Sequence, residues 1–172
     1  KGLNGIEDRC QYLKSCGLPV YFTTWIGHTA EAISDQITSQ YRENGIKAFK
    51  MKISPNFSDD FEKINKVKNA IPEDIELSVD ANQTLSLDQA KTWMAALSKI
   101  GAKWLEEPFA PDNTPLFKEL SKFKEKEQWS TEIATGENCP NHYCAAELMS
   151  SGVTRFQPDP CRMLGLIDAI FV

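Results

Sequence analysis

Short runs of apolar residues alternate along this chain with longer runs in which apolar residues recur at every third or fourth position. Runs of the first kind are typical of β-strands, and runs of the second kind predict amphipathic helices. Six runs of the first kind predict strands at residues 20–25, 46–53, 75–80, 103–106, 131–136 and 153–158. Because strands and helices alternate, we expect an α/β fold with a parallel sheet covered by helices.

Start and stop signals place the helices between these strands. In the first helix, Ile33, Ile37 and Tyr41 recur at four-residue spacing before a stop at Asn44-Gly45. Signals for the start of later helices stand at Ser58, at Ser86 with Gln89 as a capping box, at Thr114-Pro115, at His142 and near Gly165. Each of these helices follows a predicted strand, as a β-α repeat requires.

The two faces of the predicted strands favour a barrel over an open, doubly wound sheet. In the second strand Phe49, Met51 and Ile53 point one way, and Lys50 and Lys52 point the other. Charged residues at the C-terminal tips of successive strands are typical of a barrel mouth. No glycine-rich phosphate turn follows the first strand, where a doubly wound sheet would favour one. We therefore expect a TIM-type (β/α) barrel.

The length of the chain limits how much of a barrel it can form. A complete eight-stranded barrel takes roughly 250 residues, whereas this chain has 172 residues and begins with Lys1 rather than Met. We therefore expect residues 1–172 to be a partial barrel domain of strands one to six, truncated at both ends. We also expect this piece alone to be inactive and not a stable barrel, because its two outer strands would be open edges.

Composition and charge exclude several classes of protein. The net charge of −5 is spread along the chain, and no basic stripe indicates nucleic acid or an anionic membrane surface. No apolar run is long enough to span a bilayer, and no secretion signal stands at the start. An odd number of cysteines without a C-x-x-C spacing favours a reduced intracellular protein, cytoplasmic or mitochondrial. These are Cys10, Cys16, Cys139, Cys144 and Cys161.

Acidic residues stand at the ends of four consecutive predicted strands: Asp80, Glu106, Glu137 and Asp159. In a barrel they would converge on one mouth, since each follows the last by about one β/α unit. Three carboxylates that close together cannot all stay ionised without a cation. Mg²⁺ suits such oxygen ligands and keeps positions open for water and substrate oxygens. The pattern therefore predicts a Mg²⁺ site.

Two lysines belong to the same predicted mouth. Lys50 and Lys52 lie two positions apart on one strand, so both side chains point to the same side. Two ammonium groups beside a divalent cation are expected to have lowered pKa values. A lysine held in that way can act as a general base near neutral pH.

Four segments, at residues 49–53, 79–83, 104–108 and 134–138, resemble the enolase superfamily in order and spacing. The resemblance is to the mandelate racemase/muconate lactonizing enzyme type, whose strands end in K-x-K, D-x-N, E-E-P and G-E-N. Together with Asp159-Pro-Cys-Arg162, the segments look most like the L-fuconate dehydratases and their animal mitochondrial relatives. The resemblance covers nearly the whole chain.

The resemblance implies a role for most of these residues. Asp80, Glu106 and Glu137 would bind Mg²⁺. Lys52 would be the base on one face of the substrate, and Lys50 would help hold the substrate carboxylate and tune Lys52. A capping domain that covers the mouth would lie outside this chain.

Further roles concern the rim of the mouth. The resemblance implies that Asn82 touches substrate or metal-bound groups, that Asp159 orients a histidine of strand seven which acts as the acid, and that Arg162 is a basic position at the site. Glu107 is interpreted as structural. His28 lies in the loop after the first strand, where it would contact either substrate or solvent. The other histidine, His142, is expected at the surface.

The activity implied is that of a Mg²⁺-dependent acid-sugar dehydratase, a lyase that removes the proton next to a carboxylate and eliminates the β-hydroxyl through an ene-diolate. A racemase or epimerase with the same first half-reaction is the alternative. A catalytically impaired homologue with a binding role is another, because Ser54 and Leu164 replace glycines of the family pattern. The partner would be a small sugar acid, and the full-length protein is expected to be a homo-oligomer.

Overall fold

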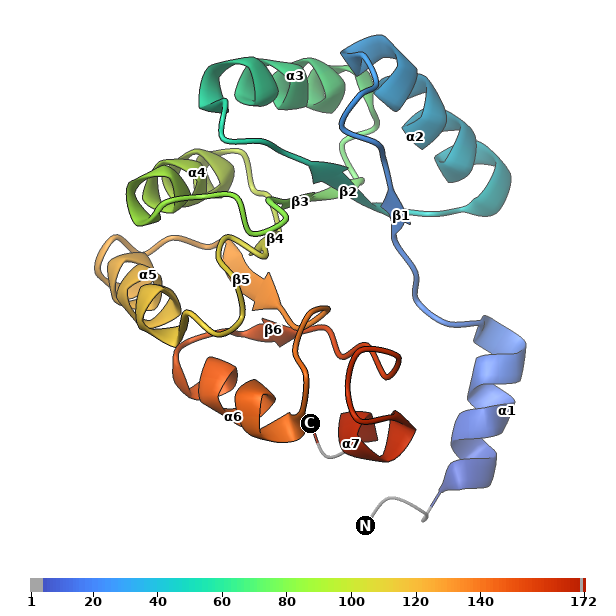
Figure 1. Ribbon diagram of the computed structural model, residues 1–172. Coiled ribbons are helices and arrows are strands. Elements are labelled where there is room, and N and C mark those ends of the chain that lie inside the picture. Colours follow the sequence, from blue (N-terminus) through green and yellow to red (C-terminus); the bar gives the residue numbers. More distant parts are fainter. Residues whose placement is uncertain (1–4, 171) are drawn as a thin grey trace.

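A computed structural model describes residues 5–170 and 172, so Lys1 lies outside the described part. Its six strands form one parallel sheet in chain order (Figure 1). The strands are β1 (Phe22–Thr23), β2 (Ala48–Lys52), β3 (Glu76–Asp80), β4 (Trp104–Glu106), β5 (Glu132–Thr135) and β6 (Arg155–Phe156). All six predicted strands are therefore confirmed, although each is shorter than the apolar run that predicted it.

A helix follows every strand, and one more precedes the first. The helices are α1 (Ile6–Cys16), α2 (Ala30–Asn44), α3 (Phe57–Ala70), α4 (Leu87–Lys99), α5 (Thr114–Lys126), α6 (His142–Ser150) and α7 (Leu166–Ile170). None of the helices in the described part of the chain combines the length and apolarity needed to cross a membrane. All five cysteines are free thiols.

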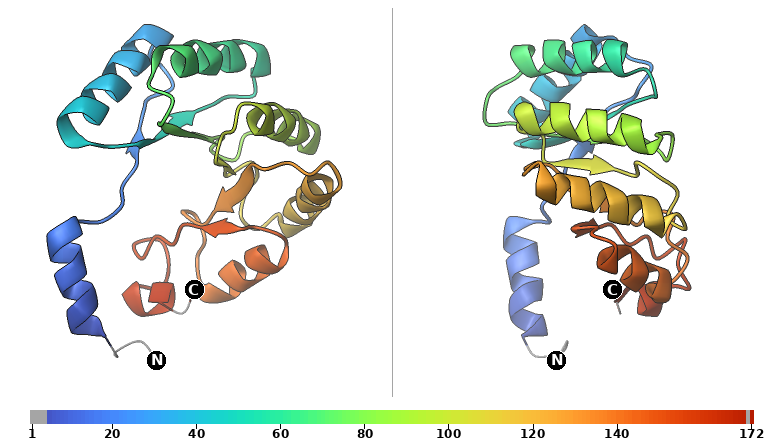
Figure 2. Two further views of the ribbon diagram at one scale, coloured as in Figure 1. Left: turned by 180° about the vertical axis from the view of Figure 1, so that it is seen from behind. Right: turned by 90° about the vertical axis from the view of Figure 1, so that its left-hand side faces the viewer.

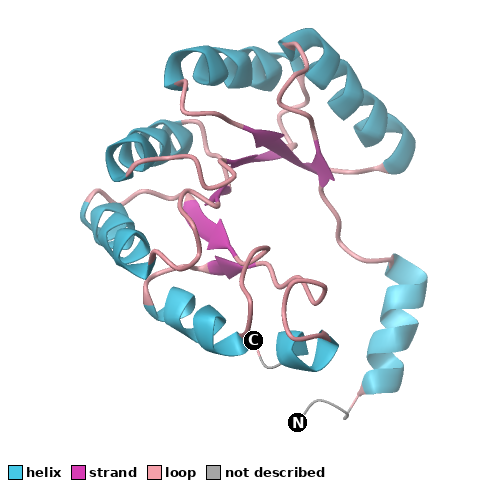
Figure 3. Ribbon diagram, in the orientation of Figure 1, coloured by secondary structure: helices cyan, strands magenta, loops and turns pink. Residues whose placement is uncertain are grey.

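The sheet curves into an arc, with α2 to α6 on its outer side and the strands within (Figures 2 and 3). The curvature brings the two ends of the sheet into contact, because the Gln157 amide just after β6 donates to the Tyr21 hydroxyl just before β1 at 3.2 Å. An open doubly wound sheet would keep its edge strands apart. The expected partial TIM-type barrel of six β/α units is confirmed.

The apolar core lies between the sheet and its helices. Alternate residues of the strands, such as Phe49, Met51 and Leu77, are buried there. They pack with the buried faces of the helices, to which Ile37 and Trp93 belong. Burial of this outer face leaves the opposite face of each strand, which carries polar residues such as Lys50 and Asp80, for the inside of the barrel. The packing therefore decides which side chains line the interior.

Two of the predicted helix signals are confirmed in detail. Helix α2 ends at Gly45, whose φ of 66° lies in the left-handed region that glycine favours. Helix α4 begins with a complete capping box. Ser86 Oγ accepts a hydrogen bond from the backbone N–H of Gln89, and the side-chain oxygen of Gln89 accepts one from the backbone N–H of Ser86.

Two predicted caps were wrong by one or two positions. Asn56 occupies the cap of α3, so Ser58 lies inside that helix, and Asn113 occupies the cap of α5, whose first residue is Thr114. Neither cap residue makes a side-chain capping bond. Helix α5 still begins with a backbone signal, because Pro115 occupies one of its first positions.

Helix α1 was not predicted. None of its residues is buried, and it stands apart from the sheet (Figure 1). Its signal in the sequence consists of acidic Glu7 and Asp8 in the first turn, Lys14 in the last turn and Gly17 as the stop. Periodicity alone could not identify it, because it contributes no side chain to the core.

Replacing Ser86 tests the capping box. Ser86→Ala removes the acceptor for a helix N–H and should lower the free energy of unfolding by about 1 kcal/mol. Urea unfolding followed by circular dichroism measures this change. Ser58→Ala is the matched control, because Ser58 is exposed and makes no capping bond; it should change stability by less than about 0.5 kcal/mol. Equal losses in the two variants would contradict the assigned cap.

Candidate active site at the C-terminal strand ends

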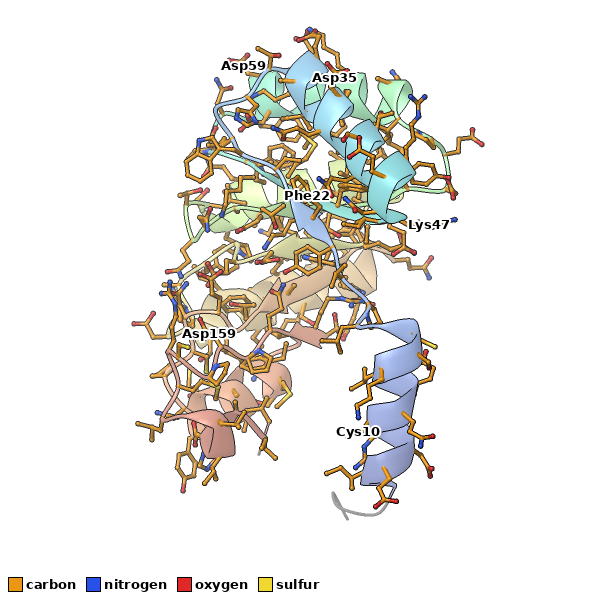
Figure 4. The ribbon with its side chains drawn as sticks, turned by 90° about the vertical axis from the view of Figure 1, so that its right-hand side faces the viewer. Cys10, Phe22, Asp35, Lys47, Asp59 and Asp159 are labelled. Atoms are coloured by element: carbon orange, nitrogen blue, oxygen red, sulfur yellow. The ribbon has the colours of Figure 1, made fainter. Side chains whose placement is uncertain are left out.

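The register of three neighbouring strands brings the predicted site residues together. Lys52 of β2 pairs in register with Asp80 of β3, and Asp80 pairs with Glu106 of β4. Lys50 lies two residues before Lys52 and therefore shares its face. Figure 4 shows Asp159 and Asp59 on the side of the C-terminal strand ends and Lys47, which precedes β2, on the opposite side.

Lys50 is the cation at the centre of this group. Its Nζ donates to Glu106 Oε1 at 2.5 Å and lies 3.5 Å from Asp80 Oδ2. All three residues are at most 5% exposed. Burial acts to lower the pKa of Lys50, but the hydrogen bond and charge of Glu106 and the charge of Asp80 outweigh it, and the pKa is raised. The lowered pKa expected for this lysine applies beside a divalent cation and stays a prediction.

Lys52 has a more open position than Lys50. Its Nζ donates to Asp80 Oδ2 at 2.9 Å and to Asn82 Oδ1 at 2.7 Å. Its side chain is 21% exposed, compared with 7% for Lys50. Asn82 is held by its own backbone N–H, which donates to Asp80 Oδ1. Lys52 is thus the lysine of the pair that an incoming molecule can reach more easily.

The second oxygen of Glu106 is held from the inside of the barrel. Its Oε2 accepts from the Trp104 indole at 3.0 Å and from the Gln157 amide at 2.9 Å. Neither donor was predicted from the sequence. The available signal was their position, because Trp104 lies two residues before Glu106 and Gln157 two residues before Asp159, so each shares a face with an acid of the predicted mouth.

The other two predicted acids gather around Arg162. Glu137 Oε1 lies 3.3 Å from Arg162 Nη2, and Asp159 Oδ2 lies 3.6 Å from its Nε. Arg162 also donates to the Asn138 side chain. Glu137 therefore turns toward the rim, whereas Asp80 and Glu106 turn toward Lys50.

The donor set suits a hard divalent cation, although its members do not all point to one place. Asp80 and Glu106 are buried carboxylates that both pair with Lys50, and Asp80 also pairs with Lys52. Carboxylate oxygens are the ligands that such a cation prefers. Within residues 5–170 and 172, no group of three or more carboxylate, histidine or cysteine side chains is arranged to hold a metal. Glu137 would have to leave Arg162 to complete the set.

Glu107 connects the loops that carry the site. It is 1% exposed, and its Oε1 accepts from the side chains of Gln83 at 3.1 Å and Asn138 at 2.7 Å. Burial raises the pKa of this carboxyl, although both hydrogen bonds act against the increase. Because Gln83 follows β3 and Asn138 follows β5, these contacts support the structural role expected for Glu107.

The two histidines have side-chain partners on helices. His28 Nδ1 lies 3.3 Å from Gln36 Nε2 on α2. His142 pairs through Nδ1 with buried Asp168 of α7. The expectation of a plain surface residue was therefore wrong for His142, which is partly buried and contacts the Asp168 carboxylate.

Ser54 and Leu164, which replace glycines of the family pattern, differ in their surroundings. The backbone N–H and the hydroxyl of Ser54 both donate to Asp60 Oδ2 at 2.6 Å, which ties the loop after β2 to α3. Asp60 is a buried carboxylate, so a serine here satisfies a group that a glycine would leave with one donor fewer. Leu164 is 80% exposed.

Known proteins with similar sequences can be compared with this site. A model of the family described as enolase C-terminal domain-like matches residues 32–172. Human mitochondrial enolase superfamily member 1 is 30% identical over 95% of this chain and 37% of its own length. L-galactonate dehydratase from Hypocrea jecorina is 27% identical over 93% of this chain and 36% of its own length. The chain therefore spans little more than a third of these curated relatives.

Solved structures agree with the fold. The crystal structure of the human protein matches with a TM-score of 0.84 at 27% identity, over 97% of this chain and 38% of that one. A racemase from Streptomyces coelicolor A3(2), solved with bound magnesium, matches with a TM-score of 0.73 at 25% identity, over 83% of this chain and 42% of that one.

Gly136, which precedes Glu137, offers a test of how tightly β5 and β6 meet. Its φ is 140°, and a Cβ there would lie 2.7 Å from the backbone N of Gln157. Gly136→Ala should therefore lower the free energy of unfolding by roughly 2–5 kcal/mol, from backbone strain and overlap together. Urea unfolding measures the loss.

Gly45→Ala is the matched control for this substitution. Gly45 has a φ of 66°, but a Cβ added there would meet no atom within 4 Å, so the variant carries only the strain of about 1–2 kcal/mol. A loss at Gly136 no larger than the loss at Gly45 would show that the close backbone approach does not constrain the fold.

Proposed function

Since this chain belongs to the enolase C-terminal domain-like family, we propose that it carries most of the active site of an acid-sugar dehydratase, a lyase of the L-fuconate dehydratase kind. The observation that carries the proposal is the pair Lys50 and Lys52 bound to Asp80 and Glu106 at the C-terminal strand ends. The names of relatives such as L-galactonate dehydratase support the reaction class.

We propose Asp80, Glu106 and Glu137 as the ligands of a Mg²⁺ ion. Their carboxylate oxygens are of the type that this ion prefers, and the similar Streptomyces racemase was solved with magnesium. When bound, the ion would hold the substrate carboxylate and stabilise the negative charge that develops there. To bind the ion, Glu137 would give up its contact with Arg162.

Lys52 is proposed as the general base. Its Nζ belongs to the more exposed of the two lysine side chains, and its hydrogen bonds to Asp80 and Asn82 fix its direction. In its neutral form it would take the proton from the carbon next to the substrate carboxylate. Lys50 is buried beside Glu106, so its proposed role is to supply positive charge next to the carboxylate.

The rim residues are proposed to bind and orient the substrate. Arg162 is exposed and cationic, which suits a sugar acid with its negative charge and many hydroxyls. Asn82 would contact a substrate hydroxyl next to Lys52, and His28 is a further candidate from the β1–α2 loop. Asp159 is proposed to orient the acid that protonates the departing hydroxyl. That acid would come from a histidine beyond this chain.

A racemase or epimerase is the second candidate. The similarity to the Streptomyces racemase favours it, and both reactions begin when a base removes the α-proton. They differ in the second step, because an epimerase returns a proton to the carbon whereas a dehydratase expels a hydroxyl. Incubation with a panel of sugar acids, including L-fuconate, separates them, since only dehydration gives a 2-keto product.

The metal ligands are tested by Glu106→Gln. Calorimetric titration of the full-length protein with Mg²⁺ should show one site, and the variant should lose it because a ligand charge is removed. Glu76→Gln makes the same chemical change on the same inner face of the sheet, where Glu76 pairs with Lys103, and it should bind Mg²⁺ as the wild type does. Undiminished binding in Glu106→Gln would refute the ligand assignment.

The role of Lys52 is tested in the full-length protein by exchange of the α-proton of a bound sugar acid in D₂O, followed by NMR. Lys52→Ala should slow exchange by roughly 10²–10⁴-fold, as expected for loss of a general base, while Mg²⁺ binding persists. Lys47→Ala is the control, because Lys47 pairs with Asp74 at the other end of the strand and should leave exchange unchanged. Exchange at the wild-type rate in Lys52→Ala would exclude this base, and Lys50 would become the candidate.

A further inference from the structure

We infer that Gln157 and Trp104 are positioning residues that hold one oxygen of Glu106 and so leave its other oxygen to bind the metal. This inference rests on the proposed role of Glu106 as a ligand. It explains two polar contacts inside the barrel for which neither the proposed base nor the rim residues account.

The contacts of Glu106 divide between its two oxygens. Oε2 accepts from Trp104 Nε1 at 3.0 Å and from Gln157 Nε2 at 2.9 Å, whereas Oε1 accepts from Lys50 at 2.5 Å. A carboxylate oxygen has two lone-pair directions, so Oε2 has a donor for each. Oε1 is therefore the oxygen directed toward the charged centre shared with Asp80.

The amide of Gln157 can face Glu106 in only one orientation. Its Nε2 reaches both Glu106 Oε2 and the Tyr21 hydroxyl, the latter at 3.2 Å. A flipped amide would set its carbonyl oxygen against the carboxylate oxygen. The carbonyl oxygen of Gln157 is instead buried without a hydrogen-bond partner among the described residues. The side chain keeps its contact with Glu106 although its own acceptor stays unsatisfied.

Small residues on β5 allow Gln157 to reach Glu106. Strand β5 lies between β4 and β6, and Ala134 is its residue in register with Glu106. Gly136 follows β5, and because it has no side chain the backbone of Gln157 can approach it closely. The Gln157 amide can therefore extend across β5 to β4.

The indole of Trp104 is fixed by its neighbours. The Tyr21 ring meets it edge-on, with centroids 5.5 Å apart, and the Arg155 guanidinium lies 4.7 Å from its ring centroid. These contacts hold the ring, and the ring directs its N–H at Glu106. Both donors to Oε2 are thus themselves held in place, as the supporting partners of a metal ligand usually are.

The arrangement has a consequence for metal choice. With Oε2 occupied, Glu106 can bind an ion only through Oε1. Mg²⁺ requires near-octahedral geometry with single-oxygen contacts, whereas Ca²⁺ accepts carboxylates through both oxygens. Freeing Oε2 should therefore weaken Mg²⁺ binding more than Ca²⁺ binding.

The test measures Mg²⁺ and Ca²⁺ affinity by calorimetry in Gln157→Met and Trp104→Phe, each of which removes one donor and keeps most of the side chain's bulk. Each variant should lose about 10–100-fold in Mg²⁺ affinity and less in Ca²⁺ affinity. Gln36→Met is the control for the first, because the Gln36 amide lies on α2 and pairs with His28. Trp93→Phe is the control for the second, because the Trp93 N–H has no partner in the described residues.

The outcomes separate this inference from the proposed function. A wild-type protein that binds no Mg²⁺, or a Glu106→Gln variant that binds it normally, overturns both. Binding that is lost in Glu106→Gln but unchanged in Gln157→Met and Trp104→Phe overturns the inference alone. Equal losses for Mg²⁺ and Ca²⁺ also overturn it, because they indicate a general change of structure. Thermal melting identifies a variant that fails to fold, and the other variant then decides.

Discussion

The buried charge of Lys50 between Asp80 and Glu106 is the interaction on which the rest of this structure depends. All three groups lie almost wholly out of water, where an unpaired charge costs several kcal/mol. They come from β2, β3 and β4, so these strands must keep the register that joins them. A slip of one residue would turn Lys50 toward the apolar helices. The polar interior therefore fixes the alignment of the sheet as firmly as the apolar exterior does.

Glu106 extends this constraint across the barrel. It joins Lys50 on one side to Trp104 and Gln157 on the other, and Gln157 continues to Tyr21 at the far end of the sheet. The curvature of the sheet and the orientation of the carboxylate are consequently parts of one network. A change that flattened the arc would separate Gln157 from Glu106, whereas Trp104 lies on the same strand as Glu106 and would stay beside it.

The sequence was sufficient to predict the six strands, the barrel and the meeting of Lys50, Lys52, Asp80 and Glu106, because period-two alternation and parallel strands fix which side chains share an edge. It did not predict the contacts of Gln157. These depend on the small side chain of Ala134 on β5, the strand that lies between β4 and β6. Helix α1 was missed because it buries no side chain. Glu137 was expected beside the other acids, but a flexible arginine on the next loop competes for it.

The difference between the predicted contacts and the missed ones bears on whether the protein is a catalytically impaired homologue. The residues proposed for chemistry lie in the segments that carry the family resemblance, whereas Gln157, which also orients Glu106, lies outside those segments. A chain could therefore keep every one of these segments and still lose a correctly directed ligand through a change at Gln157. In this protein the amide, the indole and the small residues of β5 that admit them are all present. Together they keep the Glu106 carboxylate in the direction that its proposed role as a ligand requires, which the motif residues alone do not ensure.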